Sequence, residues 1–193
     1  MSARPLAKKV FHFISLVLML PAALACGFGR IRNAYSLLTH AVALLPGLVG
    51  VYLRGAFYRM TLKECAPNVH IGFGTIFAHP EASVGPFVST GLYCVIGRAS
   101  IGARTQIASL VQIPSGRRQH ARDREGRLDG AQLGEFQQTI IGADCWIGAS
   151  AIIMASVGNG TTVGAGAVVV RELPPGVVAV GNPARVLAKK EQS

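Results

Sequence analysis

The stretch that decides the fold is IIGADCWIGASAIIMASVGNGTTVGAGAVVVRELPPGVVAVGNPARV, residues 140–186. It consists of short units in which a branched aliphatic residue is followed by glycine or another small residue. Similar units begin near Val69. Among them, Ile101, Ile107 and Ile113 repeat at a spacing of six. A helix would repeat near 3.6 residues, and an amphipathic strand would alternate at two without recurrent glycine. The period therefore indicates neither element alone.

A six-residue unit repeated many times predicts a parallel β-helix. Three short strands form one triangular coil, and one aliphatic side chain per strand points inward and stacks on its equivalents in the next coil. Glycine and small residues suit the corners, where the chain turns tightly and φ is often positive. A glycine-rich β-sandwich is the alternative, but the repeat continues over most of residues 69–187. The fold class we expect is mainly β, a hexapeptide solenoid.

The order GAGAVV, PPG and GNPAR within residues 140–186 resembles the left-handed β-helix acyltransferases, or hexapeptide transferases. The stretch is similar to the ends of maltose, galactoside and serine acetyltransferases and of polysaccharide O-acetyltransferases. The resemblance implies a left-handed parallel β-helix, acetyl-CoA as acetyl donor, and a homotrimer with active sites between subunits. The DHATG-like segment of serine acetyltransferases is absent, since the matching segment is FVSTGLYCVIG.

Residues 114–138 form a polar loop that interrupts the repeat, and loops this long inside a compact domain are often functional. The resemblance implies that a loop here carries a catalytic histidine, and His120 is the only histidine in it. Imidazole can take the proton of a hydroxyl as its oxygen attacks a thioester. In the family this histidine often lies nearer the loop start, close to the position of Arg117 or Arg118 here. His79, in FAHPEASVG, is the second candidate. Backbone N–H groups of Ser115 and Gly116 are candidates for holding the oxyanion.

Small residues are also expected along a cofactor groove, because a larger side chain would block the pantetheine arm. The positions that match the family groove are Gly148, Ala149, Ala165 and Gly166. Trp146 is either a neighbouring cofactor contact or a packed solenoid residue. Arg171 and Arg185 are candidates for pairing with a phosphate of acetyl-CoA, or are ordinary solvated cations.

No metal site is expected, because His79 and His120 are too few for the three-histidine site of the similar γ-class carbonic anhydrases. The four cysteines are isolated, without a CxxC pair or zinc spacing, which indicates reduced thiols in the cytoplasm.

The first 63 residues have a different composition and predict a helical region that associates with a membrane. Residues 10–29 carry no formal charge, and the length of this segment is close to that needed to span a bilayer. A second apolar run covers residues 34–57. Pro21 and Pro46 interrupt these runs, which suggests a bent hairpin or helices lying in the interface. A cleaved signal peptide and a soluble helical cap are the alternatives.

The net charge of +10 comes with basic residues at the ends of the apolar runs, as expected of membrane flanks. Aromatic residues that would stack on bases are not interleaved with them, which argues against nucleic acid as a partner. We therefore expect the enzyme at the cytoplasmic face of the cell membrane, or alternatively free in the cytoplasm.

Together these observations predict a helical region over 1–63, an acyltransferase solenoid over 64–187 and a short tail, 188–193. The expected reaction is acetyl transfer from acetyl-CoA to a hydroxyl of a sugar, polysaccharide or glycan precursor. N-acetylation of an amino sugar or a small amine such as an antibiotic, and a non-catalytic solenoid scaffold, are the alternatives. The sequence does not identify the acceptor.

Overall fold

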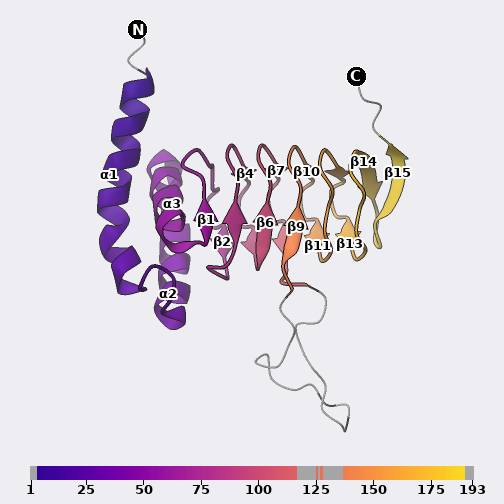
Figure 1. Ribbon diagram of the computed structural model, residues 1–193, viewed down its shortest axis with the longest axis horizontal. Helices are drawn as coiled ribbons and strands as arrows, with labels where there is room; N and C mark the ends of the chain where they lie inside the picture. Colours follow the sequence, from indigo (N-terminus) through magenta and orange to yellow (C-terminus); the bar gives the residue numbers. More distant parts are fainter. Residues whose placement is uncertain (1–3, 117–124, 126, 128–136, 190–193) are drawn as a thin grey trace.

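The computed structural model describes residues 4–116, 125, 127 and 137–189. It is a β-solenoid of about six turns preceded by three helices (Figure 1). The helices are α1 (Arg4–Ala25), α2 (Arg32–Ala43) and α3 (Gly47–Thr61). The predicted fold class, a mainly β solenoid with a helical N-terminal region, is confirmed.

The solenoid has three faces, and successive coils add one short strand to each. Sheet A contains β1 (Glu64–Cys65), β3 (Ser83–Val84), β6 (Ala99–Ile101) and β9 (Thr139–Ile141). Sheet B contains β4 (Ser89–Thr90), β7 (Gln106–Ile107), β10 (Trp146–Ile147), β12 (Thr162–Val163), β14 (Val177–Val180) and β15 (Arg185–Lys189). Sheet C contains β2 (Ile76–Phe77), β5 (Val95–Ile96), β8 (Gln112–Ile113), β11 (Ile152–Ile153) and β13 (Val168–Val169). All neighbours pair in parallel except β15, which runs antiparallel to β14 and closes sheet B.

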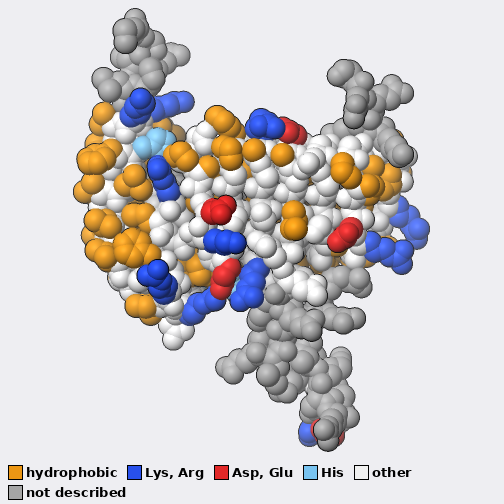
Figure 2. All heavy atoms as spheres, in the orientation of Figure 1, with side chains coloured by type: hydrophobic (Ala, Val, Ile, Leu, Met, Phe, Trp, Pro, Cys, Tyr) orange, Lys and Arg blue, Asp and Glu red, His pale blue; other side chains and the backbone are white. Residues whose placement is uncertain are grey.

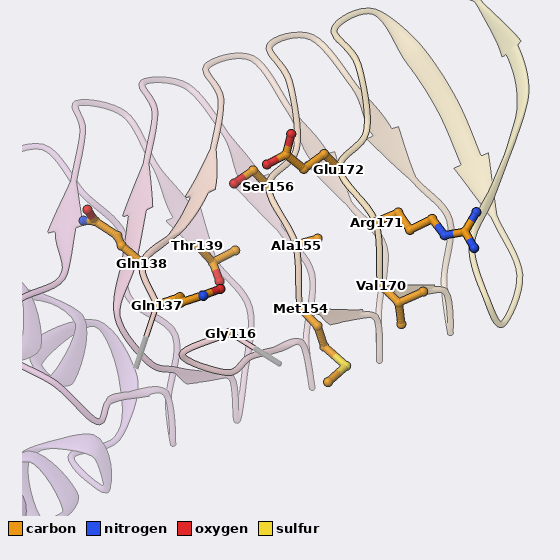
Figure 3. Close-up of a pocket in the computed structure, with 10 residues that line it drawn as sticks. All are labelled: Gly116, Gln137, Gln138, Thr139, Met154, Ala155, Ser156, Val170, Arg171 and Glu172. Carbon is orange, nitrogen blue, oxygen red and sulfur yellow. The ribbon is translucent and has the colours of Figure 1, made fainter. Parts of the chain in front are cut away.

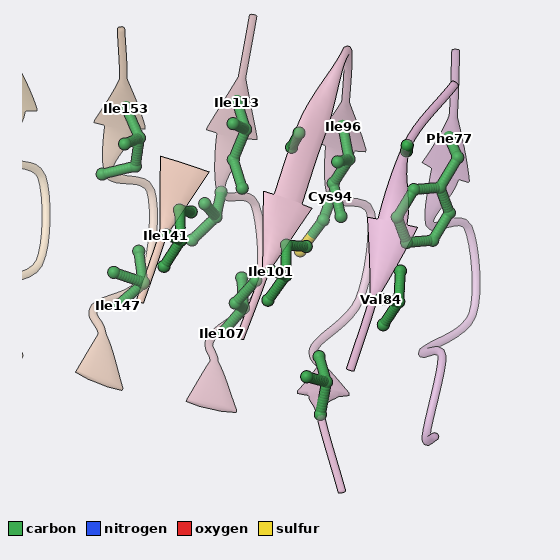
Figure 4. Packing of buried hydrophobic residues seen from close by; sticks show 14 of the residues in the cluster. Phe77, Val84, Cys94, Ile96, Ile101, Ile107, Ile113, Ile141, Ile147 and Ile153 are labelled. Carbon is green, nitrogen blue, oxygen red and sulfur yellow. The ribbon is translucent and has the colours of Figure 1, made fainter. Parts of the chain in front are cut away.

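The core is a column of aliphatic side chains that stack from coil to coil (Figure 4). Ile107 pairs with Ile147 across sheet B, and both are at most 3% exposed. In most strands the preceding residue points outward, and Trp146 is 58% exposed beside the fully buried Ile147, whereas both residues of β3 are buried. This alternation within two-residue strands explains why one aliphatic per unit was conspicuous in the sequence.

The corners that join one sheet to the next lie above one another in successive coils and form three columns. Two of these columns have a fixed geometry. From β3 to β13, the A–B corners (85–88, 102–105, 142–145, 158–161) and the B–C corners (91–94, 108–111, 148–151, 164–167) all have the same length. The third residue of each corner is left-handed, as in Leu110 (φ 64°) and Gly166 (φ 68°). A Cβ at Gly148 would collide with the Ala165 nitrogen of the next coil. These corners therefore allow close stacking of the coils.

The C–A corners differ, because their lengths vary from coil to coil. They comprise residues 78–82, 97–98, 114–138, 154–156 and 170–172. We call this column of corners the C–A edge. Within its described residues, a positive φ occurs only at Gly116. The C–A edge is thus the side of the solenoid where the chain is not held to one turn geometry.

Helices α2 and α3 cover the first coil through buried polar contacts. Tyr35 Oη of α2 donates to Phe77 O over 2.8 Å, and Tyr58 Oη of α3 accepts from Phe77 N over 3.2 Å. Arg54 is 1% exposed and donates to the carbonyls of Ile71 and Leu45. Arg54 is therefore a buried tie between α3 and the first coil, rather than an exposed basic residue at the end of an apolar run.

Helix α1 lies beside α3 and remains largely uncovered. It continues through Pro21, whereas Pro46 directly precedes α3, so the predicted interruption is wrong for Pro21 and confirmed for Pro46. Within the described chain, the segment Lys8–Ala25 is the one helix long and apolar enough to cross a membrane by length and composition.

Candidate active site

The candidate site lies along the C–A edge, where residues 114–116 follow β8 and residues 137–138 precede β9. His79 occupies the same edge in the first coil, and Arg171 occupies it two coils beyond the loop mouth. The mouth itself is formed by Ser115 and Gly116. The fold therefore brings His79, Ser115, Gly116 and Arg171 to one edge, although they are spread widely along the sequence. His120 lies outside the described residues.

Ser115 and Gly116 are held in place by hydrogen bonds across neighbouring coils. Ser115 is 2% exposed, and its Oγ accepts from Arg98 N over 2.8 Å. Its carbonyl accepts from Gln137 N over 3.1 Å, which joins the two ends of the loop. Gly116 N donates to Pro114 O over 2.9 Å, so this bond would have to exchange before the N–H could bind an oxyanion. The role of both residues stays a prediction.

A groove of about 400 Å³ begins at the loop mouth and runs along the edge (Figure 3). It is lined by residues from the loop ends and from the next two C–A corners, namely Gly116, Gln137, Gln138, Thr139, Met154, Ala155, Ser156, Val170, Arg171 and Glu172. This volume is within the range of small-molecule sites, roughly 300–1,000 Å³. The groove is therefore large enough for part of an extended ligand.

The groove offers backbone, hydroxyl and charged groups rather than a purely apolar wall. Ser156 Oγ accepts from Ile140 N over 3.3 Å, which ties two coils together inside it. Arg171 and Glu172 are exposed, and their side chains leave the chain in different directions (Figure 3). Arg171 is a cation among the residues that line the groove, and its pairing with a phosphate of acetyl-CoA stays a prediction.

His79 lies on the other side of the loop mouth, in a cavity of about 160 Å³ that Ser115 also lines. Its Nδ1 is 3.5 Å from Arg32 Nη1 of α2. Burial lowers the pKa of His79, while Glu81 acts in the opposite direction and Arg98 and Arg32 lower it further. Neutral imidazole is consequently favoured, as a general base requires.

Glu81 lies near His79 and contacts both Arg32 and Arg98. It forms an ion pair with Arg32, and its Oε1 is 3.6 Å from Arg98 Nη2. Burial raises the pKa of Glu81, but a hydrogen bond from its own backbone and the charge of Arg32 outweigh this, and its pKa is lowered. Glu81 is therefore an anion between two cations at the edge of the site.

The residues expected to line the cofactor groove fall into separate places. Gly148 and Ala149 lie in one B–C corner, directly before Ala165 and Gly166 in the next coil, and Gly166 N donates to Ala149 O over 2.8 Å. These four positions lie together, and their contact with a cofactor stays a prediction. Trp146 lies exposed on the adjoining strand β10, and Arg185 lies on β15 of the same sheet. Arg171 is on the C–A edge instead, beside the loop.

Several residues of the site carry no signal in the sequence. Arg32, Glu81 and Arg98 come from a helix and two different coils, and no spacing rule connects them. Ser156 and Glu172 each follow an aliphatic unit, as corner residues generally do, so the sequence does not distinguish them from other corner residues. Among the residues that the structure describes, no three His, Cys, Asp or Glu side chains converge as a metal ion would require.

Comparisons with known proteins agree with this architecture. Nodulation protein L of Rhizobium meliloti is 35% identical over 150 residues, which is 67% of this chain and 80% of that protein. A maltose O-acetyltransferase structure from Clostridium difficile 630 superposes with a TM-score of 0.71 at 21% identity, covering 88% of this chain and 89% of the other. A galactoside acetyltransferase solved with coenzyme A gives 0.63 at 19% identity, covering 83% and 82%. No family model matches the chain.

The chain therefore belongs to the hexapeptide-repeat acetyltransferase family. The two superpositions support the fold, and the relationship in sequence supports the family. A relative from Schizosaccharomyces pombe is 29% identical over 129 residues, 64% of this chain, and the chain spans 54% of that relative's length.

Proposed function

We propose that this protein transfers an acetyl group from acetyl-CoA to a hydroxyl of a sugar, polysaccharide or glycan precursor. The observation that carries the proposal is the groove on the C–A edge, which starts at the mouth of the loop that contains His120 and has Arg171 along it. A donor bound there would have its reactive end near the loop and a cation beside its phosphates. The resemblance of residues 140–186 to sugar acetyltransferases supports a sugar hydroxyl as acceptor.

In this reaction His120 removes the proton of the acceptor hydroxyl while the oxygen attacks the thioester carbonyl carbon. The carbon–sulfur bond then breaks, and the imidazolium returns the proton to the thiolate of coenzyme A. The N–H groups at Ser115 and Gly116 stabilise the oxyanion formed between these steps. The B–C corner wall of Gly148, Ala149, Ala165 and Gly166, with Trp146 and Arg185, serves the cofactor of an adjoining subunit in a homotrimer. The acetyl transfer takes place at the cytoplasmic face of the cell membrane.

The base is tested by release of free coenzyme A thiol in three alanine variants. We expect His120→Ala to lower kcat about 100- to 10,000-fold with unchanged folding. His70→Ala is the control, because His70 is an exposed histidine of the first coil and lies outside the site. A loss in His79→Ala with normal rates in His120→Ala would move the base to His79.

The acceptor class is tested with neutral sugars, amino sugars and chloramphenicol as parallel acceptors. An O-acetyl product loses its acetyl group to hydroxylamine, whereas an N-acetyl product does not. Hydroxylamine-resistant product from an amino sugar would replace hydroxyl transfer by N-acetylation. Absence of thiol release with every acceptor, together with no binding of acetyl-CoA, would favour a non-catalytic scaffold.

A further inference from the structure

The helical end of the molecule exposes an unusually apolar surface. Helix α1 buries few of its large side chains, and Phe13, Val17 and Leu18 are each more than half exposed. Figure 2 shows hydrophobic side chains gathered over this end, with Lys and Arg around them. Soluble monomers rarely expose contiguous apolar patches beyond a few hundred Å². A partner is therefore expected on this surface.

This surface is not flat, because α1 and α3 leave a groove of about 500 Å³ between them. One wall is formed by Phe11, Ile14 and Leu18 of α1, which follow the three- and four-residue spacing of one helix face. The other wall is formed by Leu48, Val49 and Leu53 of α3. A groove with these mainly apolar walls suits a hydrocarbon chain.

The charges around the groove are of one sign. Lys8 lines it and also lines an adjoining cavity of about 340 Å³ that reaches the first coil. All nine acidic residues of the chain lie at Glu64 or beyond it. Eight basic residues precede Glu64; of these, Arg54 is buried and Arg32 is paired with Glu81, and the other six are Arg4, Lys8, Lys9, Arg30, Arg59 and Lys63. The helical region is therefore complementary to an anionic surface.

The packing of α1 favours a helix that lies on a membrane over one that crosses it. The Phe11 and His12 rings contact the Tyr52 ring of α3, with centroids 5.8 and 5.2 Å apart. Helix α3 in turn packs on the first coil, through contacts such as that of Arg54 with Ile71. A crossing α1 would carry this coil and its exposed corner backbone into hydrocarbon, where irregular backbone is not tolerated.

We propose that the groove between α1 and α3 binds an acyl chain of an anionic membrane phospholipid, with Lys8 beside the lipid phosphate. The inference adds a defined lipid site to the membrane location that belongs to the proposed function. It does not depend on acetyl transfer, since the groove lies on the helices and not on the C–A edge. An amphipathic surface of this kind binds through both apolar burial and attraction to anionic lipid.

The test measures co-sedimentation of the full-length protein with phosphatidylcholine vesicles, with and without phosphatidylglycerol. We expect the double variant Leu18→Gln, Leu48→Gln to weaken binding at least about tenfold, because two apolar side chains are replaced in the groove. Leu110→Gln is the control, since Leu110 is 54% exposed on a solenoid corner. Lys8→Gln should weaken binding to phosphatidylglycerol vesicles on the order of fivefold and reduce its salt dependence. Lys63→Gln, at the far end of α3, should have a smaller effect.

A phosphatidylglycerol with a photoreactive acyl chain then locates the site. We expect cross-links on residues 11–18 and 48–53. Cross-links confined to the solenoid, or equal binding by the groove variant and the wild type, would overturn the proposal. So would a change of oligomeric state in the groove variant without a change in vesicle binding, because a second copy would then cover the groove. Thiol release with a soluble acceptor is measured in parallel, so a failed lipid site is distinguishable from a failed acetyltransferase.

Discussion

At the scale of single residues, Arg54 shows how a buried charged side chain can hold parts of the fold together. Its guanidinium is buried and donates to backbone carbonyls of the first coil and of the α2–α3 connection. Burial lowers its pKa, while the neighbouring Tyr58 acts in the opposite direction. The cost of burying this cation is thus offset by its hydrogen bonds to backbone carbonyls.

We expect Arg54→Met to reduce the free energy of unfolding by at least about 2 kcal/mol, because buried carbonyls lose a charged donor. Urea denaturation followed by circular dichroism measures this change. Arg59→Met is the matched control on the same helix, since Arg59 is exposed. Equal stability of the two variants would contradict the assigned role of Arg54.

At the scale of elements, most strands of the solenoid separate an inward position from an outward one. Ile147 is fully buried on β10, whereas Ile140 on β9 of the same coil is 54% exposed. We expect Ile147→Ala to reduce the free energy of unfolding by about 2–5 kcal/mol, because it opens a cavity in the stacked aliphatic core. Ile140→Ala removes the same atoms from the surface. A comparable loss for both variants in thermal unfolding would be inconsistent with the stacked core.

The elements also show what could be predicted from the sequence. The solenoid was predictable because each coil repeats the same local physics, an inward aliphatic followed by a tight corner. The placement of Gly148 and Gly166 at corners of the coils was predictable for the same reason, whereas their contact with a cofactor stays a prediction. The cluster of Arg32, Glu81 and Arg98 was not, because it depends on how α2 packs against the coils. Continuation of α1 through Pro21 was also missed, since a helix can accommodate proline where its surroundings permit.

At the scale of the whole molecule, the helices act as the cap of the solenoid. Helices α2 and α3 cover Ile71 and Phe77, which are at most 1% exposed at the open end of the core. At the other end, β15 closes sheet B. Repeat proteins require such caps, because an uncovered end exposes both core and strand edges.

We expect removal of residues 1–63 to give an aggregating protein, since it uncovers this end of the core. Removal of residues 1–20 should leave a folded protein, because Pro21 then begins a shortened helix and α2 and α3 remain. Size-exclusion chromatography and circular dichroism distinguish the two outcomes. A soluble, cooperatively unfolding product of the longer truncation would show that the cap is dispensable.

The unequal corners of the coil also have an evolutionary consequence. An insertion into an A–B or B–C corner would displace a left-handed residue that each coil holds in register with the next. The C–A edge already accommodates corners from two residues, 97–98, up to the loop of 114–138. Lineages of this fold can therefore lengthen, shorten or exchange segments on that one edge while the rest of the coil stays constant. New acceptor specificities would then arise by insertion at a permissive edge, without redesign of the scaffold.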